Sequence, residues 1–518
     1  MHTQMRIGVK GMSDFSKPNE NTASARLHSI RGAFFRNASL TTEHDFTKGI
    51  SLKEGGCLLP PPEHVMRAMQ HTMFDFVQFP YHLYPDQNIS ELFLDDIRKY
   101  FEESCGIKQS AQTEVSIGFG SSHIFDGVLS AVCKPDNILL APAAFYHSFA
   151  DWPVKWGSSL EWVETDKNNG HKLMASELRA WLEMPENKDK EVGALLLWNP
   201  GTTGALYTQQ ELEALAEVIR EYDLLVYCDE VFRDTEFKDK KTISLGSLPD
   251  MDKHVITATS GSKNRSVANF RIGWGTGPKH IMDKVNHYMD FTITDVPLYL
   301  QHIGRAILNT SQGWLDEARD EYAVRADLIE TLVDKTNQDL NAHFNTKAVS
   351  YISIPYAPEA GHYTMLNMDA LKGFKAPSGQ TIEDGHDLTF FFYDPNKDQD
   401  PTKSVAFSSG YSKGHDDLSL YIAFAQLGYE QVSNLLSPVM KQRLLDNAAN
   451  ENSADDEVVL SMSDSAELKQ AYQAGHGILV EAFNRVSASI KSLEPSGAFK
   501  QKHGLQQTSG PSSKDLKL

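Results

Sequence analysis

The chain has 518 residues, of which 41% are hydrophobic and 23% charged, a composition typical of a soluble globular protein with more than one domain. Its formal net charge of −20 argues against a nucleic-acid-binding protein, because such a protein needs a basic surface to meet phosphates. The four cysteines contain no C-x-x-C pair, and neither a signal-peptide core nor a run of about 18 apolar residues is found. We therefore expect a reduced, cytoplasmic protein.

Short apolar runs alternate with amphipathic ones through the middle of the chain. A proline-rich segment precedes a helical pattern that ends at about Tyr100. Apolar residues at helical spacing then recur between Ile124 and Val132. We expect four strands in this part of the chain: Val115–Ile117, Gly193–Trp198, Leu224–Cys228 and Val255–Ala258.

A capping box marks the start of a helix in the same region. Thr208 and Glu211 stand three residues apart, and they are followed by Leu212, Leu215 and Ile219 on one predicted face. Strand–helix alternation of this kind predicts an α/β fold in which helices sandwich a mostly parallel sheet. Ligands of such sheets bind outside the carboxyl ends of the strands, and most of the motifs described below follow a strand end.

We divide the chain into four parts. Residues 1–48 are polar and are expected to be an N-terminal arm. A large domain (49–330), a small α+β domain (331–449) and an extension (450–518) follow. The first segment of the large domain is expected to contribute to the small one.

The extension has three expected features. The acidic stretch Asn450–Glu457 is expected to be a linker, and the residues from about Pro495 to be disordered. Between them a helix is expected to carry one apolar face, formed by Leu479, Phe483, Val486 and Ile490.

The segment Thr259–Trp274 is the most informative of the chain. A predicted strand delivers Ser260, then Lys263, and Arg271 follows eight residues after the lysine. A lysine at the end of a buried strand can form a Schiff base with an aldehyde, and a serine and an arginine can bind a phosphate. The alternative is a surface loop with scattered basic residues.

This segment resembles the cofactor-lysine motif S-x-S-K-x(7)-R-x-G of fold-type I pyridoxal-phosphate enzymes, the aminotransferase class I/II superfamily. The resemblance implies that pyridoxal 5′-phosphate forms a Schiff base with Lys263 and that Ser260 and Arg271 bind its phosphate. It also implies a homodimer with shared active sites. The small domain of such enzymes is expected to follow the large cofactor-binding one.

A Gly-Ser turn follows the first predicted strand. Backbone N–H groups and the helix dipole at Gly118–Ser122 favour an anion, although such a turn is often only a turn. It also half-matches a dinucleotide fingerprint, but His123 stands where the third glycine should be. The resemblance implies that Gly120, Ser121 and Ser122 contact the cofactor phosphate.

Asp229 stands at the end of another apolar strand. A half-buried carboxylate needs a positive partner to stay ionised, unless it is simply a solvated group at a strand end. The resemblance implies that this partner is the protonated pyridine nitrogen of the cofactor. It also implies that Tyr146, or else Phe145, stacks on the pyridine ring.

Several positions depart from the family pattern. The tyrosine that contacts the cofactor's ring oxygen in the family is Phe232 here, and the Asn-Pro loop has lost one residue, so that either Asn199 or Gly201 takes the place of the family's asparagine. Tyr84 matches only loosely the tyrosine that reaches the phosphate from the partner subunit.

The family's carboxylate-binding arginine is also absent. Tyr421 stands in its place in the predicted strand of the small domain. A phenol does not replace a bidentate guanidinium without loss, so another residue binds the carboxylate or the substrate is atypical. Arg233 and Arg265 are candidate replacements, and both are also candidates for ordinary surface arginines.

The resemblance implies an aminotransferase that acts on an amino acid and a 2-oxo acid. The alternative within the cofactor class is a lyase, a decarboxylase or a cyclising biosynthetic enzyme, which Phe232 and Tyr421 favour. A non-catalytic ligand sensor and a nucleotide-binding oxidoreductase are rivals of other classes, but the oxidoreductase leaves Lys263 and Asp229 unexplained. We expect no metal site, because no H-E-x-x-H or C-x-x-C pattern is present.

Overall fold

The structure is a computed structural model, and the residues described are 49–53, 55–82, 87–150, 152–393, 403–410, 414, 417–446 and 458–505, with backbone alone at 87–90 and 147. All of them belong to one unit, Asp45–Leu518. The predictions for residues 1–48, Tyr84, most of the loop at 394–403, the linker at 450–457 and the end of the tail lie outside the described residues.

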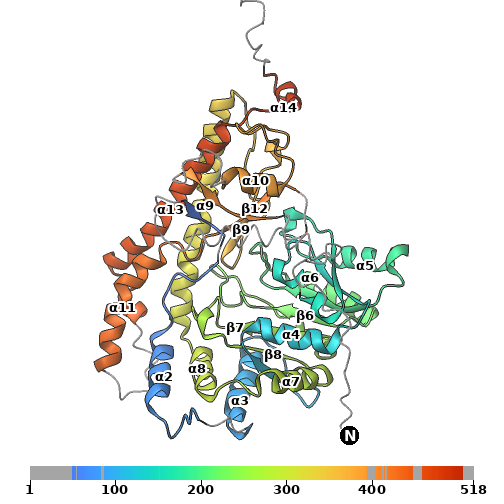
Figure 1. Cartoon of the computed structure of the whole chain (residues 1–518), viewed down its shortest axis with the longest axis vertical. Coiled ribbons are helices and arrows are strands. Elements are labelled where there is room, and N and C mark those ends of the chain that lie inside the picture. Colours follow the sequence, from blue (N-terminus) through green and yellow to red (C-terminus); the bar gives the residue numbers. More distant parts are fainter. Residues whose placement is uncertain are drawn as a thin grey trace, which may run out of the picture. The chain divides into compact units, whose positions relative to one another are not determined.

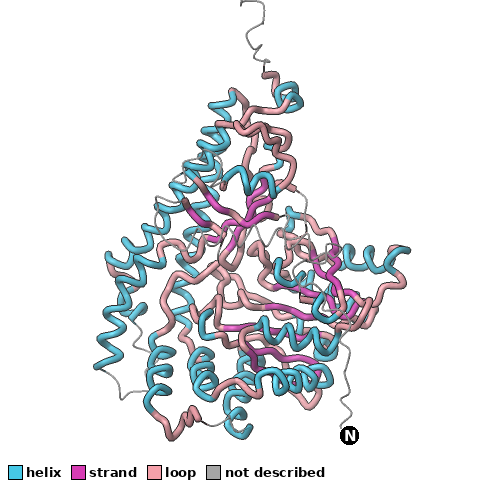
Figure 2. Tube along the Cα trace, viewed as in Figure 1, coloured by secondary structure: helices cyan, strands magenta, loops and turns pink. Residues whose placement is uncertain are grey.

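A seven-stranded sheet lies within the segment predicted to be the large domain (Figures 1 and 2). Its order is β2-β8-β7-β6-β5-β3-β4, and β8 alone runs antiparallel to its two neighbours while the other pairs are parallel. The strands span Thr113–Gly118 (β2), Ile138–Pro142 (β3), Ser159–Val163 (β4), Val192–Trp198 (β5), Val226–Asp229 (β6), Val255–Ser260 (β7) and Gly273–Pro278 (β8). The predicted α/β fold with a mostly parallel sheet is therefore confirmed.

Helices cover both faces of this sheet, which explains why β5 is apolar at consecutive positions. Leu195 and Leu197 pack on one face with α5 (Ala175–Glu183) and α6 (Gln209–Glu221), and Leu196 packs on the other face with α4 (Ser121–Val132) and α7 (Lys279–Ile293). Figure 1 shows α4 and α7 side by side. The predicted capping box is also present, because Thr208 and Glu211 each accept a hydrogen bond from the other's backbone N–H at the start of α6.

Three further helices pack over the β2–β8 edge of the sheet. They are α2 (Glu63–Phe74), α3 (Gln87–Glu103) and α8 (Leu298–Leu308). Their apolar faces enclose Trp274 of β8 together with Val115 and Ile117 of β2. The long helix α9 (Gln312–Phe344) follows α8.

The segment predicted to be a small domain contributes to an antiparallel sheet with the order β11-β12-β9 (Ser408–Ser409, Ser419–Ala423 and Tyr363–Asn367). A separate parallel pair joins β1 (Ile50–Ser51) to β10 (Val405–Ala406), so a segment from the start of the described chain lies beside residues near position 405. The helices of this part are α10 (Gly385–Phe392), α11 (Tyr429–Asp446), α12 (Val458–Met462), α13 (Ala466–Lys491) and α14 (Gly497–Lys502). Within the described residues, no helix is both long and apolar enough to cross a membrane.

Helix α13 runs beside α9 (Figure 1) and buries all four residues of the predicted apolar face, Leu479, Phe483, Val486 and Ile490. The prediction of disorder from about Pro495 is wrong for residues up to 505. Ser496 caps α14, and the buried ring of Phe499 packs 4.9 Å from the ring of Phe374. Backbone hydrogen bonds between Lys375 and Glu494 and an ion pair between Lys500 and Glu494 also hold this segment, so its polar composition does not leave it disordered.

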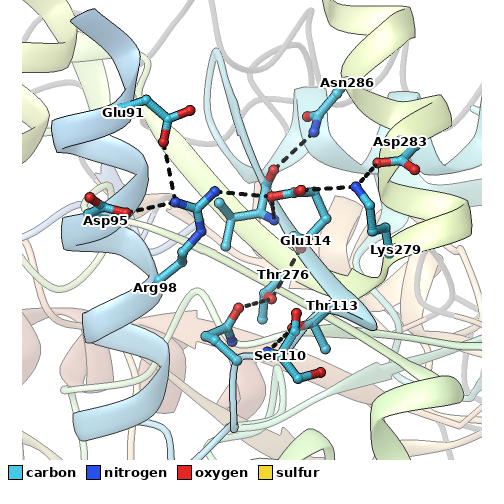
Figure 3. Close-up of polar contacts among 12 residues, drawn as sticks. Glu91, Asp95, Arg98, Ser110, Thr113, Glu114, Thr276, Lys279, Asp283 and Asn286 are labelled. Carbon is cyan, nitrogen blue, oxygen red and sulfur yellow. Dashed lines mark hydrogen bonds and ion pairs between the residues drawn. The ribbon is translucent and has the colours of Figure 1, made fainter. Parts of the chain in front are cut away.

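An ion-pair network attaches the first residues of β2 to the helices around it (Figure 3). Glu114 pairs with Arg98 of α3 at 3.3 Å and with Lys279 of α7 at 3.2 Å. Burial alone would raise the pKa of Glu114, but the Val115 amide, Lys279 and Arg98 outweigh it and hold the pKa below its usual value. The network therefore fixes the strand whose opposite end leads into the Gly-Ser turn.

We expect Glu114→Gln to lower the free energy of unfolding by about 0.5–1.5 kcal/mol at pH 7, since the network is partly exposed to solvent. The folded-state pKa of Glu114 is depressed. Its contribution to the free energy of unfolding is therefore present above the unfolded-state pKa and is lost as the pH falls through the folded-state pKa. Urea unfolding at neutral and acidic pH measures the difference, which should disappear in acid. Glu217→Gln, on the exposed face of α6, is the control. Equal behaviour of the two variants at every pH would contradict the prediction.

Candidate active site

The ends of three parallel strands meet at one edge of the central sheet. Trp198 of β5 pairs with Asp229 of β6, and Asp229 pairs in turn with Ala258 of β7. The Asn199 N–H donates to the Asp229 carbonyl oxygen at 3.2 Å, and β7 ends at Ser260, three residues before Lys263. Asn199, Asp229 and the lysine loop therefore share the carboxyl edge of the sheet, as expected of a ligand site.

The loop that carries Lys263 is held against the turn after β6. The Asn264 side-chain amide donates to the Arg233 carbonyl oxygen at 2.9 Å, and Arg265 pairs with Asp234 at 2.9 Å. The two residues that follow Lys263 therefore attach its loop to the turn after β6.

The structure places neither candidate arginine on the surface, so that expectation is wrong for both. Arg233 is 4% exposed and pairs with the fully buried Glu230 at 2.7 Å. It also donates to Ser244 and to two backbone carbonyl oxygens, so its guanidinium is already occupied. Arg265 is 3% exposed and faces Asp234. Both arginines attach the lysine loop and the turn after β6 to the core.

Asp229 is a buried carboxyl that accepts one hydrogen bond within the described residues, from the Val231 N–H at 3.0 Å. Burial raises the pKa of Asp229 to about 7, with the Val231 amide opposing and Glu230 adding to the rise. No ion pair of Asp229 occurs among the described residues. A cation placed beside this carboxyl would favour its ionised form.

The Gly-Ser turn and Arg271 lie together. Gly120 has a φ of +84° and precedes α4, whose first residues are Ser121 and Ser122. Arg271 donates to the Phe119 carbonyl oxygen at 3.3 Å, and a Cβ atom on Gly120 would lie 2.9 Å from its Nη2 atom. The turn thus brings a helix N-terminus and an exposed guanidinium to one place, a combination that suits an anion.

The two aromatic candidates after β3 differ in exposure. Tyr146 is 44% exposed, whereas Phe145 is 3% exposed and packs with its ring 5.9 Å from that of Trp162. Phe145 therefore belongs to the core, and Tyr146 presents the accessible ring.

Asn199 is 1% exposed and its side chain is engaged within the protein. Its Nδ2 donates to the Ile243 carbonyl oxygen at 2.7 Å, and its Oδ1 accepts from the Tyr207 N–H at 3.4 Å. The Gly201 N–H donates to the Ala205 carbonyl oxygen at 2.8 Å. Both candidates for the family's asparagine thus make internal hydrogen bonds.

Comparisons with known proteins identify the family. Residues 47–360, more than half of the chain, match aminotransferase class I and II. The chain belongs to the aminotransferase class I and II family.

Relatives and solved structures agree with this assignment. The chain is 25% identical over 283 residues to an aromatic-amino-acid aminotransferase of Thermococcus litoralis, covering 54% of this chain and 70% of that protein. It is 26% identical over 251 residues to an aspartate aminotransferase of Pyrococcus abyssi, covering 48% of this chain and 63% of that protein. The crystal structure of an aspartate aminotransferase from Rhizobium meliloti shares the fold with a TM-score of 0.67 at 18% identity, covering 95% of this chain and 100% of that one.

This family member is a transferase of the pyridoxal-phosphate-dependent type, and it transfers an amino group between an amino acid and a 2-oxo acid. The relatives do not favour the lyase alternative that Phe232 and Tyr421 suggested. Tyr84 lies outside the described residues. Tyr421 lies on β12 opposite Met365, is fully buried, and packs in a small cluster with Met365 and Ala144. The position of the usual arginine is therefore part of the core in this enzyme.

Sequence reasoning missed two parts of the site, His362 and residues 55–57. The Lys263 Nζ atom donates to the Gly55 carbonyl oxygen at 2.6 Å, and His362 Nδ1 lies 3.2 Å from the same oxygen. The Gly55-Gly56 pair was an available signal, because adjacent glycines often mark a close approach of the backbone. No comparable signal marks His362, which is a single histidine just before β9 begins.

Proposed function

We propose that this aminotransferase carries pyridoxal 5′-phosphate on Lys263 and acts as a homodimer. The observation that carries the proposal is the buried Asp229 carboxyl, which shares a sheet edge with the lysine loop and has no ion-pair partner among the described residues. Its pKa of about 7 means that a neighbouring cation would ionise it at neutral pH.

The residues present fit this cofactor. A protonated pyridine nitrogen is the cation that Asp229 lacks, and the Lys263 amine can bond to an aldehyde. The phosphate has a cradle at Gly120, where the absence of a side chain leaves room beside Arg271 and the α4 N-terminus. A Cβ atom on Gly273 would collide with the Ser121 nitrogen, so β8 also presses closely on this cradle.

We assign each residue of the site a part in holding the cofactor. Lys263 binds it covalently, Asp229 faces the ring nitrogen, and Tyr146 covers the ring. The phosphate is held by four side chains and one backbone position: Ser121, Ser122, Ser260, Arg271 and Gly120. Asn199 and Phe232 would be the residues next to the cofactor's ring oxygen, and the buried ring of Phe232 would offer that oxygen no hydroxyl.

Bound there, the cofactor would supply an electron sink for the substrate's α-carbon and a carrier for the amino group. The Lys263 amine, once released, takes the proton from that α-carbon. Asp229 stays ionised and holds the ring nitrogen positive. Arg271 and the α4 N-terminus keep the phosphate fixed, so the reacting atoms stay within reach of the lysine.

The substrate's carboxylate is held differently from the family's pattern. Tyr421 is fully buried beside Met365 and Ala144, and Arg233 and Arg265 are bound to acidic partners. None of these three side chains is placed to grip a carboxylate. We therefore propose that the amino acid and the oxo acid are recognised without a guanidinium from β12.

An exposed apolar patch supports the homodimer. Five residues at the end of α2 and just beyond it are between 52% and 94% exposed: Met73, Phe74, Phe76, Val77 and Tyr81. Apolar side chains gathered in this way are a common mark of a protein interface. They immediately precede Tyr84, which we propose reaches the cofactor phosphate of the partner subunit. Sedimentation of the purified protein tests this assembly, and a monomer would contradict it.

The half-reaction tests the proposed chemistry. Adding an amino acid to the cofactor-loaded enzyme without an oxo acid should remove the visible band of the lysine-bound cofactor and release one equivalent of 2-oxo acid per site. Aspartate and the aromatic amino acids are the first donors to try. Release of carbon dioxide or ammonia in place of the oxo acid would reject the aminotransferase in favour of a decarboxylase or a lyase.

A further inference from the structure

Residues 55–57, which we call the Gly55 strap, lie across Lys263. The Gly55 carbonyl oxygen accepts from the lysine Nζ atom at 2.6 Å, and the Gly56 N–H donates to Gln426 Oε1 at 3.1 Å. The Cys57 thiol donates to the Lys263 carbonyl oxygen at 3.1 Å. The strap therefore contacts both the side chain and the backbone of the lysine.

The strap is packed too closely to carry side chains at its two glycines. A Cβ atom on Gly55 would collide with the ring of Tyr363, and one on Gly56 would collide with Gln426 Oε1. The next residue, Leu58, donates its N–H to the Tyr322 hydroxyl at 3.2 Å. The position of the Gly55 carbonyl is thus set by its surroundings.

His362 shares the acceptor of the lysine. Its side chain is 0% exposed, and Nδ1 lies 3.2 Å from the Gly55 carbonyl oxygen. A carbonyl oxygen only accepts hydrogen bonds, so Nδ1 carries the hydrogen and donates. The imidazole is wedged edge-on between Phe232 and Tyr322, with ring centroids 5.4 and 5.1 Å away.

The histidine stays neutral beside the lysine. Burial and the charge of Lys263 lower the pKa of His362 to about 3, against the opposing effect of the Gly55 and Lys263 backbone carbonyls. Its backbone is attached to the small domain, because the Phe424 N–H donates to the His362 carbonyl oxygen at 3.0 Å. A neutral donor on a fixed backbone can hold the strap without repelling the lysine.

The shared oxygen has a consequence for the lysine. A carbonyl oxygen has two lone pairs and can accept from Nζ and Nδ1 together. If the lysine were the only donor to the buried Gly55 oxygen, that oxygen would be left without a hydrogen bond whenever Lys263 is bonded elsewhere. A buried acceptor without a hydrogen bond is unfavourable. His362 continues to satisfy that oxygen, so the strap keeps its place for the returning amine.

We propose that His362 is a positioning residue for Lys263, which acts through the Gly55 carbonyl to fix where the lysine amine rests when it is not bonded to cofactor. The functional part of this inference rests on the proposed cofactor role of Lys263. The restraint on the amine is a property of the cofactor-free chain and can be measured there.

The test compares three variants of His362 in the cofactor-free protein. His362→Phe keeps a ring between Phe232 and Tyr322 but removes the donor. His362→Asn places an amide donor near the position of Nδ1, whereas His362→Gln places it near that of Nε2. The control is His254→Phe, since His254 Nδ1 also lies near a carbonyl oxygen, at 3.1 Å from that of Leu224, but just before β7 begins.

The readout is the rate of reductive methylation of Lys263, followed by peptide mapping. We expect it to rise about three- to tenfold in His362→Phe and His362→Gln, as for the loss of one hydrogen bond, and to stay near the wild-type rate in His362→Asn and His254→Phe. If His362→Phe does not fold, the comparison of the methylation rates of His362→Asn and His362→Gln tests the proposal. Unchanged rates in His362→Phe, or equal rates in the Asn and Gln variants, would overturn the proposal.

A second readout separates this inference from the proposed function. Formation of the visible band after addition of pyridoxal phosphate should be slower in His362→Phe than in the wild type. If the wild type forms no band, the proposed cofactor role of Lys263 is wrong. The methylation rates still test the positioning role of His362.

Discussion

Lys263→Ala should abolish the visible band of the cofactor-loaded enzyme and lower kcat/KM by at least about 10²- to 10⁴-fold, the range that a positioned acid–base group contributes. The reason is that the proposed function gives this one side chain two tasks, covalent attachment and proton transfer at the α-carbon. Steady-state kinetics measures the loss, and borohydride reduction with peptide mapping locates the attachment.

Lys284→Ala is the matched control, because Lys284 is an exposed lysine of α7 in the same domain. It should leave both the band and the rate unchanged. If borohydride labels another lysine in the wild type, or if Lys263→Ala keeps its band, the assignment of Lys263 is wrong.

Asp229→Asn should lower kcat/KM by roughly 10²- to 10³-fold while the cofactor still binds. Removing one partner of a buried ion pair costs about 3–5 kcal/mol, and we expect most of that loss in the transition state. Lys263 and Arg271 are unchanged, so the visible band should remain. Asp223→Asn, an exposed change just before the same strand, is the control. An Asp229→Asn enzyme of wild-type activity would sink the proposed contact with the ring nitrogen.

The same substitution should have the opposite effect on the stability of the cofactor-free protein. Because burial raises the folded-state pKa of Asp229 to about 7, the folded state binds this proton more tightly than the unfolded state does. The associated stability is fully present below the unfolded-state pKa of about 3.9 and is lost as the pH rises to about 7. Asparagine removes this dependence, so at pH 8 the variant should resist urea better than the wild type, by up to a few kcal/mol. Identical pH profiles of unfolding would contradict this account.

Local patterns in the sequence predict a large part of the fold. The capping box at Thr208 and Glu211 is recognisable because its hydrogen bonds join residues three apart. The buried strands are recognisable because helices cover both faces of the sheet. Lys263 and Asp229 follow strand ends, so their proximity follows from the parallel order of β6 and β7.

Contacts between distant segments are what the sequence does not reveal. The buried Arg233 donates to Ser104, which lies far earlier in the chain, and to Thr242 and Ser244 in the loop that follows it. The order at Phe499 likewise depends on Phe374. Neither contact can be predicted from neighbouring residues. An arginine or an aromatic residue that made no such contact could have the same residues around it in the sequence.

The pairing of β1 with β10 has a consequence for how the enzyme is made. The Leu52 N–H donates to the Ala406 carbonyl oxygen at 2.8 Å, and the Gly56 N–H donates to Gln426. A ribosome adds these partners more than 350 residues after it has made the N-terminal segment, and closing so long a loop is slow. All seven strands of the large sheet precede both partners in the sequence, so they can be synthesised before the contacts that hold the Gly55 strap are available. The contacts that hold the Gly55 strap can therefore form only after these distant partners have been made.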